Sequence, residues 1–166
     1  CTDNSSRWST RNSSLDTTIN IDTQNPTIGG PTYTPARNGA GWNNSNVTVT
    51  WTCADVGPAG IDFAASATTS SYTVDGLYPA TGIGADKAGN SVSATTPVKR
   101  DKTTPSITIL GANPLTWEAL IAYIDPGATA TDTLSGILGS IATTSTVNVN
   151  LLGTYSYGYS VSDIAS

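Results

Sequence analysis

The amino-acid sequence predicts an all-β protein, and three observations support this fold class. Thr and Ser make up about 28% of the 166 residues; Thr favours strands and Ser favours turns. Of the residues that favour helices, Glu occurs once and Met is absent. Short runs of alternating apolar and polar residues are separated by clusters of Gly, Pro, Asn and Asp. This pattern is typical of a sandwich or barrel of short strands.

Several segments have the alternation expected of strands. The clearest is 46–53, in which Val47, Val49, Trp51 and Cys53 alternate with threonines, as in a half-buried strand with a polar outer face. The other predicted strands are residues 14–22, 105–110, 144–153 and 153–163.

Residues 115–124 are the one stretch that resembles a helix in composition. Their apolar content suits either a buried helix or a bent strand, and periodicity alone does not decide between the two. Because Pro114 and Pro126 bracket the stretch closely, we favour a strand.

The aromatic residues allow two interpretations. Tyr155, Tyr157 and Tyr159 could form a sugar-binding platform, but a stripe with strand spacing is more often core, and a tyrosine near the penultimate strand often anchors a sandwich corner. Trp8 and Trp42 lie in polar contexts and are better candidates than the tyrosines for an exposed contact, although the signal is weak.

A short segment of the chain occurs twice. In "NIDTQNPTI" (20–28) and "KRDKTTPSI" (99–107), an Asp is followed four residues later by Pro, then Thr or Ser, then Ile. A second marker, an Asp followed by a turn of small residues, recurs at Asp3, Asp86 and Asp163. Such a period indicates repeated units of about 80 residues, the size of a seven-stranded sandwich.

The period predicts the domain organisation. Residues 1–22 would be the closing strand or strands of a preceding or neighbouring sandwich, 23–101 a first domain, and 102–166 a second domain that lacks its last strand. The recurring segment would then be the joint at which one sandwich passes into the next.

These motifs resemble a known family. "NGAGWNNSNVTVTWTCAD", "ADKAGNSVSA" and "IDTQNPTI" are similar to the immunoglobulin-like (Ig-like) repeats of large bacterial and archaeal surface proteins. The stretch from "DKTTPSITIL" to "GTYSYGYSVSD" resembles a related Ig-like domain of adhesins, pesticidal crystal proteins and secreted glycosidases. The resemblance implies tandem β-sandwiches in an extended array and an extracellular or cell-surface location, but no single function.

The two cysteines depart from the family pattern. The resemblance implies a disulfide between Cys53 and the penultimate strand, where the matching residue is Gly84. Cys1 holds the equivalent partner position of a preceding unit. Cys1 and Cys53 could therefore be free, paired with each other, or paired with cysteines of other units.

The incomplete outer units have two explanations. The chain could be a piece of a longer tandem array, in which the adjacent repeats are its partners. Alternatively, residues 14–22 of one copy could complete the C-terminal sandwich of its neighbour by strand addition to an open sheet edge. A head-to-tail contact of this kind would propagate into a filament.

Composition excludes several function classes. With a net charge of −5 and no basic stripe, the chain is a poor partner for nucleic acid. It contains no apolar run of the roughly 18–20 residues that span a bilayer, so no membrane insertion is predicted. Without His, and with Glu118 as the only Glu, the usual catalytic sets cannot be assembled, and we predict no enzymatic activity.

The candidate sites use oxygen and nitrogen donors at strand ends and turns. Aspartates at strand ends are candidate calcium ligands, since calcium prefers hard oxygen donors, although Asp is also an ordinary turn residue. No other cofactor is predicted. The calcium candidates are Asp22, Asp55, Asp86, Asp101, Asp132 and Asp163, and the candidate N-glycosylation sites are Asn4, Asn12, Asn43 and Asn46.

The sequence thus predicts a structural extracellular module, a spacer, stalk or filament subunit, whose partners are copies of itself or adjacent repeats. The alternative is an adhesin or a carbohydrate-binding accessory module of a secreted protein.

Overall fold

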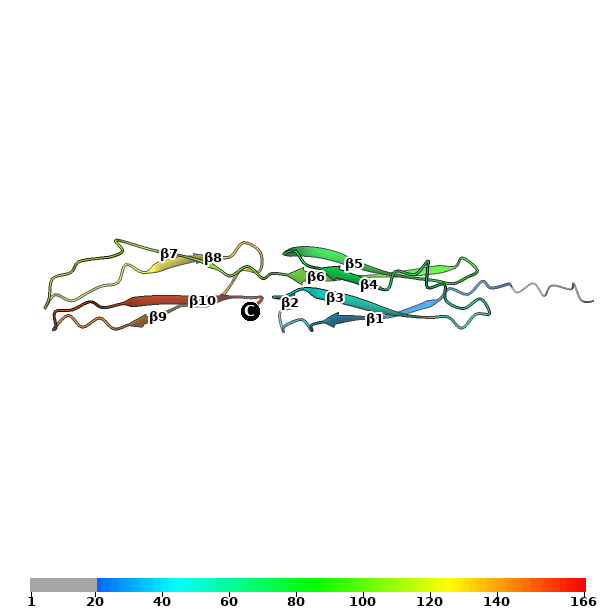
Figure 1. The fold of residues 1–166 in the computed structure, drawn as a ribbon, viewed down its shortest axis with the longest axis horizontal. Coiled ribbons are helices and arrows are strands. Elements are labelled where there is room, and N and C mark those ends of the chain that lie inside the picture. Colours follow the sequence, from blue (N-terminus) through cyan, green and yellow to red (C-terminus); the bar gives the residue numbers. More distant parts are fainter. Residues whose placement is uncertain (1–20) are drawn as a thin grey trace, which may run out of the picture.

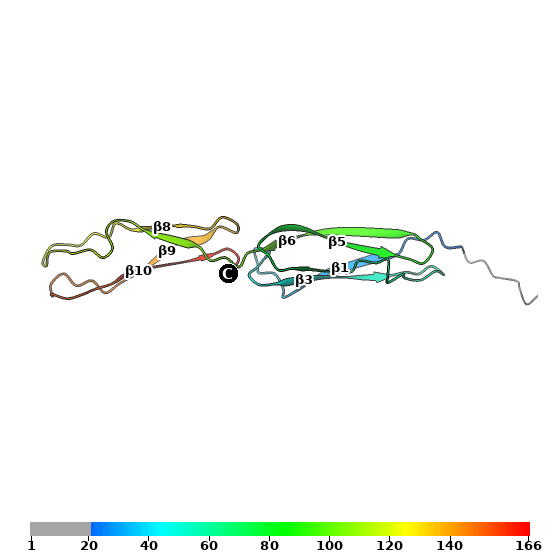
Figure 2. The same ribbon diagram turned by 45° about the horizontal axis from the view of Figure 1, so that its top comes forward.

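The computed structural model describes residues 21–166, and within this range it contains strands and no helix. No helix in this part of the chain is therefore long and apolar enough to cross a membrane. Figure 1 shows two groups of strands arranged end to end along one axis, and Figure 2 shows the same arrangement from a second direction. The all-β prediction is confirmed for these residues.

The first group contains two three-stranded sheets. One has the order β1–β3–β4 and the other the order β2–β6–β5. All pairings are antiparallel except that of β2 with β6. The strands are β1 (Thr27–Thr34), β2 (Trp42–Asn43), β3 (Val47–Ala54), β4 (Thr69–Tyr72), β5 (Gly76–Ala85) and β6 (Ser91–Arg100).

A hydrophobic core lies between these two sheets. Val47, Val49 and Trp51 alternate along β3 and turn the same face inward. Ala80 of β5 and Val98 of β6 meet them from the other sheet, and both are fully buried. The strand β6, which closes the first group, therefore supplies a central core residue.

The second group contains two two-stranded sheets, β7–β8 and β9–β10, both antiparallel. Among the described residues β10 pairs with β9 alone. Ala165 is the one buried hydrophobic residue of this group, and most of its large apolar side chains are exposed. The strands are β7 (Ser106–Ile109), β8 (Ala128–Thr131), β9 (Ile137–Ser145) and β10 (Tyr157–Asp163).

Each group has a tyrosine that anchors a corner. The Tyr78 hydroxyl donates to the backbone carbonyl of Val74 at 3.0 Å, and the Tyr155 hydroxyl donates to that of Leu151 at 3.0 Å. Both bonds reach back four residues, as expected of the tyrosine corner of Ig-like sandwiches. The corner role considered for Tyr155 is confirmed, while Tyr157 and Tyr159 are half-buried.

Some predicted strands are correct and others are not. The predictions for 46–53 and 105–110 agree with β3 and β7. The strand predicted at 115–124 is wrong, because this stretch is an exposed loop, and only the first two residues of the one predicted at 144–153 belong to a strand, β9. The predicted strand 14–22 falls almost wholly outside the described residues.

Two features of the first group differ from what their sequence suggests. The stretch from Gly29 to Pro31 looks like a turn in sequence, yet it lies within β1, where the register with β3 shifts and Gly30 has a φ of +104°. A bulge of this kind accommodates turn residues inside a strand. Trp42 is buried, not exposed, because β2 pairs with β6 and the Lys99 ammonium lies 5.7 Å from the ring centroid.

Candidate metal centres at the two joints

The six predicted calcium ligands form two clusters of three aspartates. Joint 1 is defined by Asp22, Asp55 and Asp86, and joint 2 by Asp101, Asp132 and Asp163. In each cluster the three residues offer one carboxylate oxygen apiece, and these oxygens lie within 4.8 Å of one another. Joint 2 lies where the two groups meet, and joint 1 lies at the opposite end of the first group (Figure 1).

The first aspartate of each joint follows the same local pattern. Asp22 accepts hydrogen bonds from the backbone N–H of Gln24, at 2.9 Å, and of Ala59, at 3.0 Å. Asp101 accepts from the N–H of Thr103, at 3.0 Å, and of Ser135, at 2.9 Å. In both cases one bond closes a local turn and the other fastens the segment to a loop of the group that follows it.

The second aspartate of each joint sits directly after a strand. Asp55 follows β3 and accepts from the N–H of Gly57, at 3.1 Å, and of Gly60, at 3.0 Å. Asp132 follows β8 and accepts from the N–H of Leu134, at 3.1 Å, and of Gly136, at 2.8 Å. The carboxylate thus organises the loop that reaches toward the first aspartate.

The third aspartate follows the penultimate strand of the first group and ends β10 in the second. Asp86 accepts hydrogen bonds from the N–H of Ala88, at 2.9 Å, and of Asn90, at 2.8 Å, while the Asn90 amide donates to the other oxygen. Asp163 accepts from the Ser166 hydroxyl at 2.5 Å. The two joints are therefore two copies of one arrangement.

Hydrogen bonding favours the ionised form of two of these carboxyls, Asp86 and Asp132. Burial raises the pKa of Asp86, but hydrogen bonds from the Asn90 side chain and from nearby backbone N–H groups outweigh it, so the pKa is lowered from 3.8. The pKa of Asp132 is lowered in the same way: burial raises it, and the N–H groups of Gly136, Leu134 and Ser135 lower it further.

No basic side chain among residues 21–166 neutralises either joint. The one ion pair in this part of the chain joins Arg100 to Asp75. Asp101 is completely buried, and Asp86 and Asp163 are nearly so. Buried charges in proteins are normally paired or coordinate metals, so each joint has the charge that a bound cation would balance.

The donor set suits calcium. Calcium takes oxygen ligands at about 2.3–2.6 Å, so two ligands on opposite sides of one ion are separated by about 5 Å at most. Oxygens within 4.8 Å of one another therefore fit around a common centre. Each carboxylate oxygen that accepts one backbone hydrogen bond keeps a lone pair for a cation.

Further polar contacts hold the two groups together beside joint 2. The Asn38 amide donates to the Ile164 carbonyl at 2.8 Å, and the Asp101 N–H donates to the Asn43 carbonyl at 2.9 Å. Asp75 accepts from the Arg100 guanidinium, from the Lys102 N–H at 2.9 Å and from the Thr103 hydroxyl at 2.7 Å. These contacts fasten the linker to the end of the first group; the sequence does not single out Asp75.

The structure describes only some of the candidate disulfide and N-glycosylation residues. Cys53 forms no disulfide with a described residue, and Cys1 lies outside the described range, so their pairing stays a prediction. The Asn43 amide is buried and donates to the carbonyls of Pro35 and Ala36, so the folded domain has no room for a glycan at this position.

The other sequons stay predictions. Asn46 is exposed, and its side-chain oxygen accepts a hydrogen bond from Arg100 at 2.9 Å. Asn4 and Asn12, like Trp8, lie outside the described residues.

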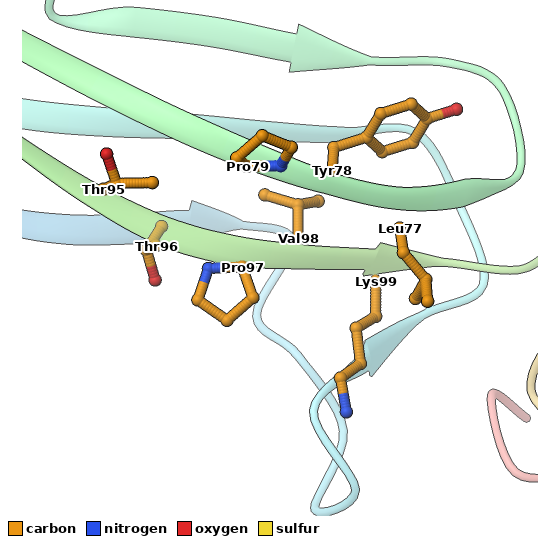
Figure 3. Close-up of a pocket in the computed structure, with 8 residues that line it drawn as sticks. All are labelled: Leu77, Tyr78, Pro79, Thr95, Thr96, Pro97, Val98 and Lys99. Carbon is orange, nitrogen blue, oxygen red and sulfur yellow. The ribbon is translucent and has the colours of Figure 1, made fainter.

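Two hollows lie away from the joints. One, of about 460 Å³, is a shallow depression over β5 and β6 lined mainly by the apolar parts of residues such as Leu77, Pro79 and Pro97 (Figure 3). The other, of about 540 Å³, lies between the loops at the far end of the second group and includes Trp117 and Tyr155. In this hollow Asp125 accepts hydrogen bonds from two tyrosine hydroxyls.

Comparison with known proteins gives one match. Residues 107–166 match the family model described as "Bacterial surface protein, Ig-like domain". Comparisons with curated proteins and with solved structures give no match. The matched region contains β8, β9 and β10 and nearly all of β7. The second group of strands is therefore similar to an Ig-like domain of bacterial surface proteins, which indicates an extracellular surface module.

Proposed function

We propose that this chain is a non-enzymatic structural module of an extracellular surface protein, in which Ig-like units stand end to end as a spacer, stalk or filament subunit. The observation that carries the proposal is the duplication of the joint. Asp22, Asp55 and Asp86 repeat the arrangement of Asp101, Asp132 and Asp163 at the same points of successive units. A joint that recurs in successive units suits a chain that extends by adding units.

Calcium at the joints would give this module its stiffness. In each joint the first aspartate belongs to the linker, whereas the other two follow strands or end them. A cation held by all three would fix the linker to the unit and remove freedom between units. Binding to the folded form alone also stabilises the fold by mass action.

Calcium titration of the whole chain tests this part of the proposal. We expect two bound ions per chain by isothermal titration calorimetry, and a higher unfolding temperature in calcium than in EDTA. Asp22→Asn and Asp101→Asn should each remove one ion. Asp62→Asn is the matched control, because Asp62 belongs to neither cluster and caps a turn through the N–H of Ala64. Equal melting curves in calcium and EDTA would refute a metal role for the joints.

Head-to-tail assembly by strand donation is the second part of the proposal. Its support is the free edge of β10 together with the strand-like sequence of residues 14–22, which precedes joint 1 as β6 precedes joint 2. Sedimentation velocity of the chain over a range of concentrations checks this: we expect elongated oligomers that a peptide of residues 14–22 dissociates. A chain that remains monomeric throughout would exclude donation.

The alternative function is ligand binding by an adhesin or carbohydrate-binding module. It is favoured by the hollow at the far end of the second group, where Trp117 is 48% exposed and packs edge-on against Tyr123. Exposed aromatic rings beside carboxylates suit sugar recognition. A glycan array probed with the chain and with Trp117→Ala tests this reading: binding lost in the variant supports it, and no binding removes it.

A further inference from the structure

The strand edge in the first group that corresponds to the free edge of β10 is paired with another strand. There, β5 pairs with β6 along its whole length, from Gly76 opposite Arg100 to Ala85 opposite Ser91. That pairing brings Val98 into the core. In the second group no described strand takes the place of β6, and its large apolar side chains stay exposed. The second group therefore presents an open edge over an incomplete core.

The joint aspartates align the two groups residue by residue. Asp86 corresponds to Asp163 and Tyr78 to Tyr155. The strand β10 therefore corresponds to β5, with residue numbers higher by 77. Asp101 corresponds to Asp22. The segment that ends at Asp22 therefore corresponds in sequence to β6, with residue numbers lower by 79.

At one pair of aligned positions, an ion pair in the first group is replaced by two apolar residues. In the first group Arg100 at the end of β6 pairs with Asp75. The corresponding residues are Ile21 and Leu152, and these are 79% and 92% exposed. Both members change together, from opposite charges to two large apolar side chains. Each would lose its exposure if the segment before Asp22 lay along β10.

The inward positions of β6 have apolar counterparts in the same segment. Val98, fully buried, corresponds to Ile19, and Ala94, which packs against the core, corresponds to Leu15. In sequence Leu15, Ile19 and Ile21 share one face of a strand. The segment 14–22 thus carries the apolar residues that the open core of the second group lacks.

The chain cannot place this segment on its own β10. Asp22 is fixed at joint 1 by Ala59, at the end of the first group remote from the second (Figure 1). Residues 14–22, even fully extended, span about 30 Å. The ten residues of β5 alone extend about 33 Å along the first group, and β10 lies beyond its far end. If residues 14–22 pair with β10, they must therefore belong to another molecule.

We propose that residues 14–22 of a second copy of this chain fill the edge of β10 and of the segment 152–156 that leads into it. The donor strand runs antiparallel to β10, with Ile21 against Leu152 and Ile19 opposite Tyr155. This inference rests on the proposed head-to-tail assembly and specifies its partner and register. The specificity comes from the apolar pair, because a donor strand carrying the Ile21→Arg substitution would bury an unpaired charge against Leu152.

A charge-swap experiment tests the contact. Leu152→Asp and Ile21→Arg should each weaken self-association, measured by sedimentation equilibrium of the whole chain, by roughly tenfold or more. Mixing the two variants should restore association as an alternating polymer. In the mixture, the donor strand of the Ile21→Arg variant places its guanidinium against the carboxylate on the acceptor edge of the Leu152→Asp variant. The reverse contact, between the donor strand of the Leu152→Asp variant and the acceptor edge of the Ile21→Arg variant, keeps the wild-type pair of Ile21 and Leu152. Phe63→Arg is the control, since Phe63 is 81% exposed and lies outside the contact.

The outcomes separate this inference from the assembly on which it rests. A wild-type chain that never associates would end both. A wild-type chain that polymerises while both variants polymerise equally well would preserve the assembly and overturn the contact proposed for it. Unchanged melting temperatures of the variant monomers, expected because both side chains are exposed, show that loss of association is not loss of folding.

Cysteine cross-linking tests the register independently. In the proposed pairing Ser160 of one copy lies opposite Ser14 of the next, as Ile83 lies opposite Ser93 in the first group. In a chain without Cys1 and Cys53, Ser160→Cys with Ser14→Cys should give a ladder of disulfide-linked oligomers. Ser160→Cys with Asp16→Cys, two residues out of register on the same face, should not. Equal ladders in both would overturn the register.

Discussion

Gly84 faces Cys53 across the two sheets of the first group, at the distance that a disulfide requires. A Cβ added at Gly84 would lie 2.9 Å from the Cys53 sulfur. In a disulfide each Cβ lies about 3 Å from the opposite sulfur, given an S–S bond of about 2.05 Å. The family resemblance implies a disulfide at this position, and the geometry for it is present although Cys53 faces a glycine.

We therefore expect Gly84→Cys to form a disulfide with Cys53. The bridge would close a loop of about 30 residues and raise the free energy of unfolding by about 3–4 kcal/mol in the chain-entropy model. Urea unfolding with and without a reductant measures the gain. Cys1→Ser in the same chain removes the competing thiol. Free thiols that persist under oxidising conditions would contradict the prediction.

Gly57 is expected to be essential for joint 1. A Cβ at this position would lie 2.1 Å from an Asp22 carboxylate oxygen, so Gly57→Ala must displace Asp22 from Ala59. We expect a loss of stability of about 1.5–3 kcal/mol, the scale of a lost charged hydrogen bond, and the loss of one of two calcium ions in a calorimetric titration. Gly39→Ala, at a site with no atom within 4 Å, is the control. A variant that still binds two ions would contradict this role.

Stability should fall at acid pH through carboxyls with lowered pKa values. The pKa of Asp75 is lowered from 3.8 chiefly by the Thr103 hydroxyl, with the Lys102 N–H and the Arg100 charge adding to the effect against burial. Asp86 and Asp132 are shifted in the same direction. Because the folded-state pKa values lie below those of the unfolded chain, these groups stabilise the fold above about pH 4, and this contribution is lost as the pH falls through the folded-state values.

Chemical unfolding at a series of pH values between 6 and 2 measures this dependence. We expect Asp75→Asn to be less stable than the wild type at pH 6, and the difference to shrink as the pH falls through the lowered pKa of the wild-type Asp75 carboxyl. A constant difference between the two proteins across this range would show that Asp75 does not act through its charge.

Val98 allows a test of whether β6, the closing strand of the first group, belongs to the cooperative core. It is fully buried in β6 between the sheets of the first group, so Val98→Ala should lower the free energy of unfolding by about 2–3 kcal/mol. Val74→Ala, at a residue 68% exposed, should change stability by less than about 0.5 kcal/mol. Urea denaturation monitored by tryptophan fluorescence compares the two. Similar losses in both variants would mean that β6 is not part of the cooperative core.

The candidate site was more predictable than the strands. The aspartates of the two joints recur at a nearly fixed spacing, and the backbone reaches the same geometry in each unit, so the sequence places all six ligand candidates. The grouping into threes is not visible in sequence, because Asp55 and Asp86 meet Asp22 only through the fold.

Specific physical features explain why some segments of this chain are difficult to assign from sequence. β1 contains Gly29, Gly30 and Pro31, which signal a turn unless a bulge accommodates them. The repeat predicts a strand between Asp86 and Asp101, where β6 lies, but β6 is rich in Ser and Thr and includes Pro97. Its apolar alternation alone is therefore too weak to reveal it, although it closes the core. The apolar loop 115–124 looks like a strand because its side chains suit burial. Some of them, such as Leu115 and Trp117, line an open hollow instead, and others, such as Leu120 and Ile124, are exposed.

The long pairing of β5 with β6 has a consequence for how the molecule resists tension along its axis. β6 runs along the axis of the molecule and passes through Asp101 into the second unit (Figure 1). Tension on the two ends would therefore pull β6 parallel to its ten-residue ladder with β5, so the hydrogen bonds are loaded together in shear and not opened one at a time. The same direction of load would act on a strand seated along β10. A pulling experiment on single molecules should find that the first unit yields at a high force in one step.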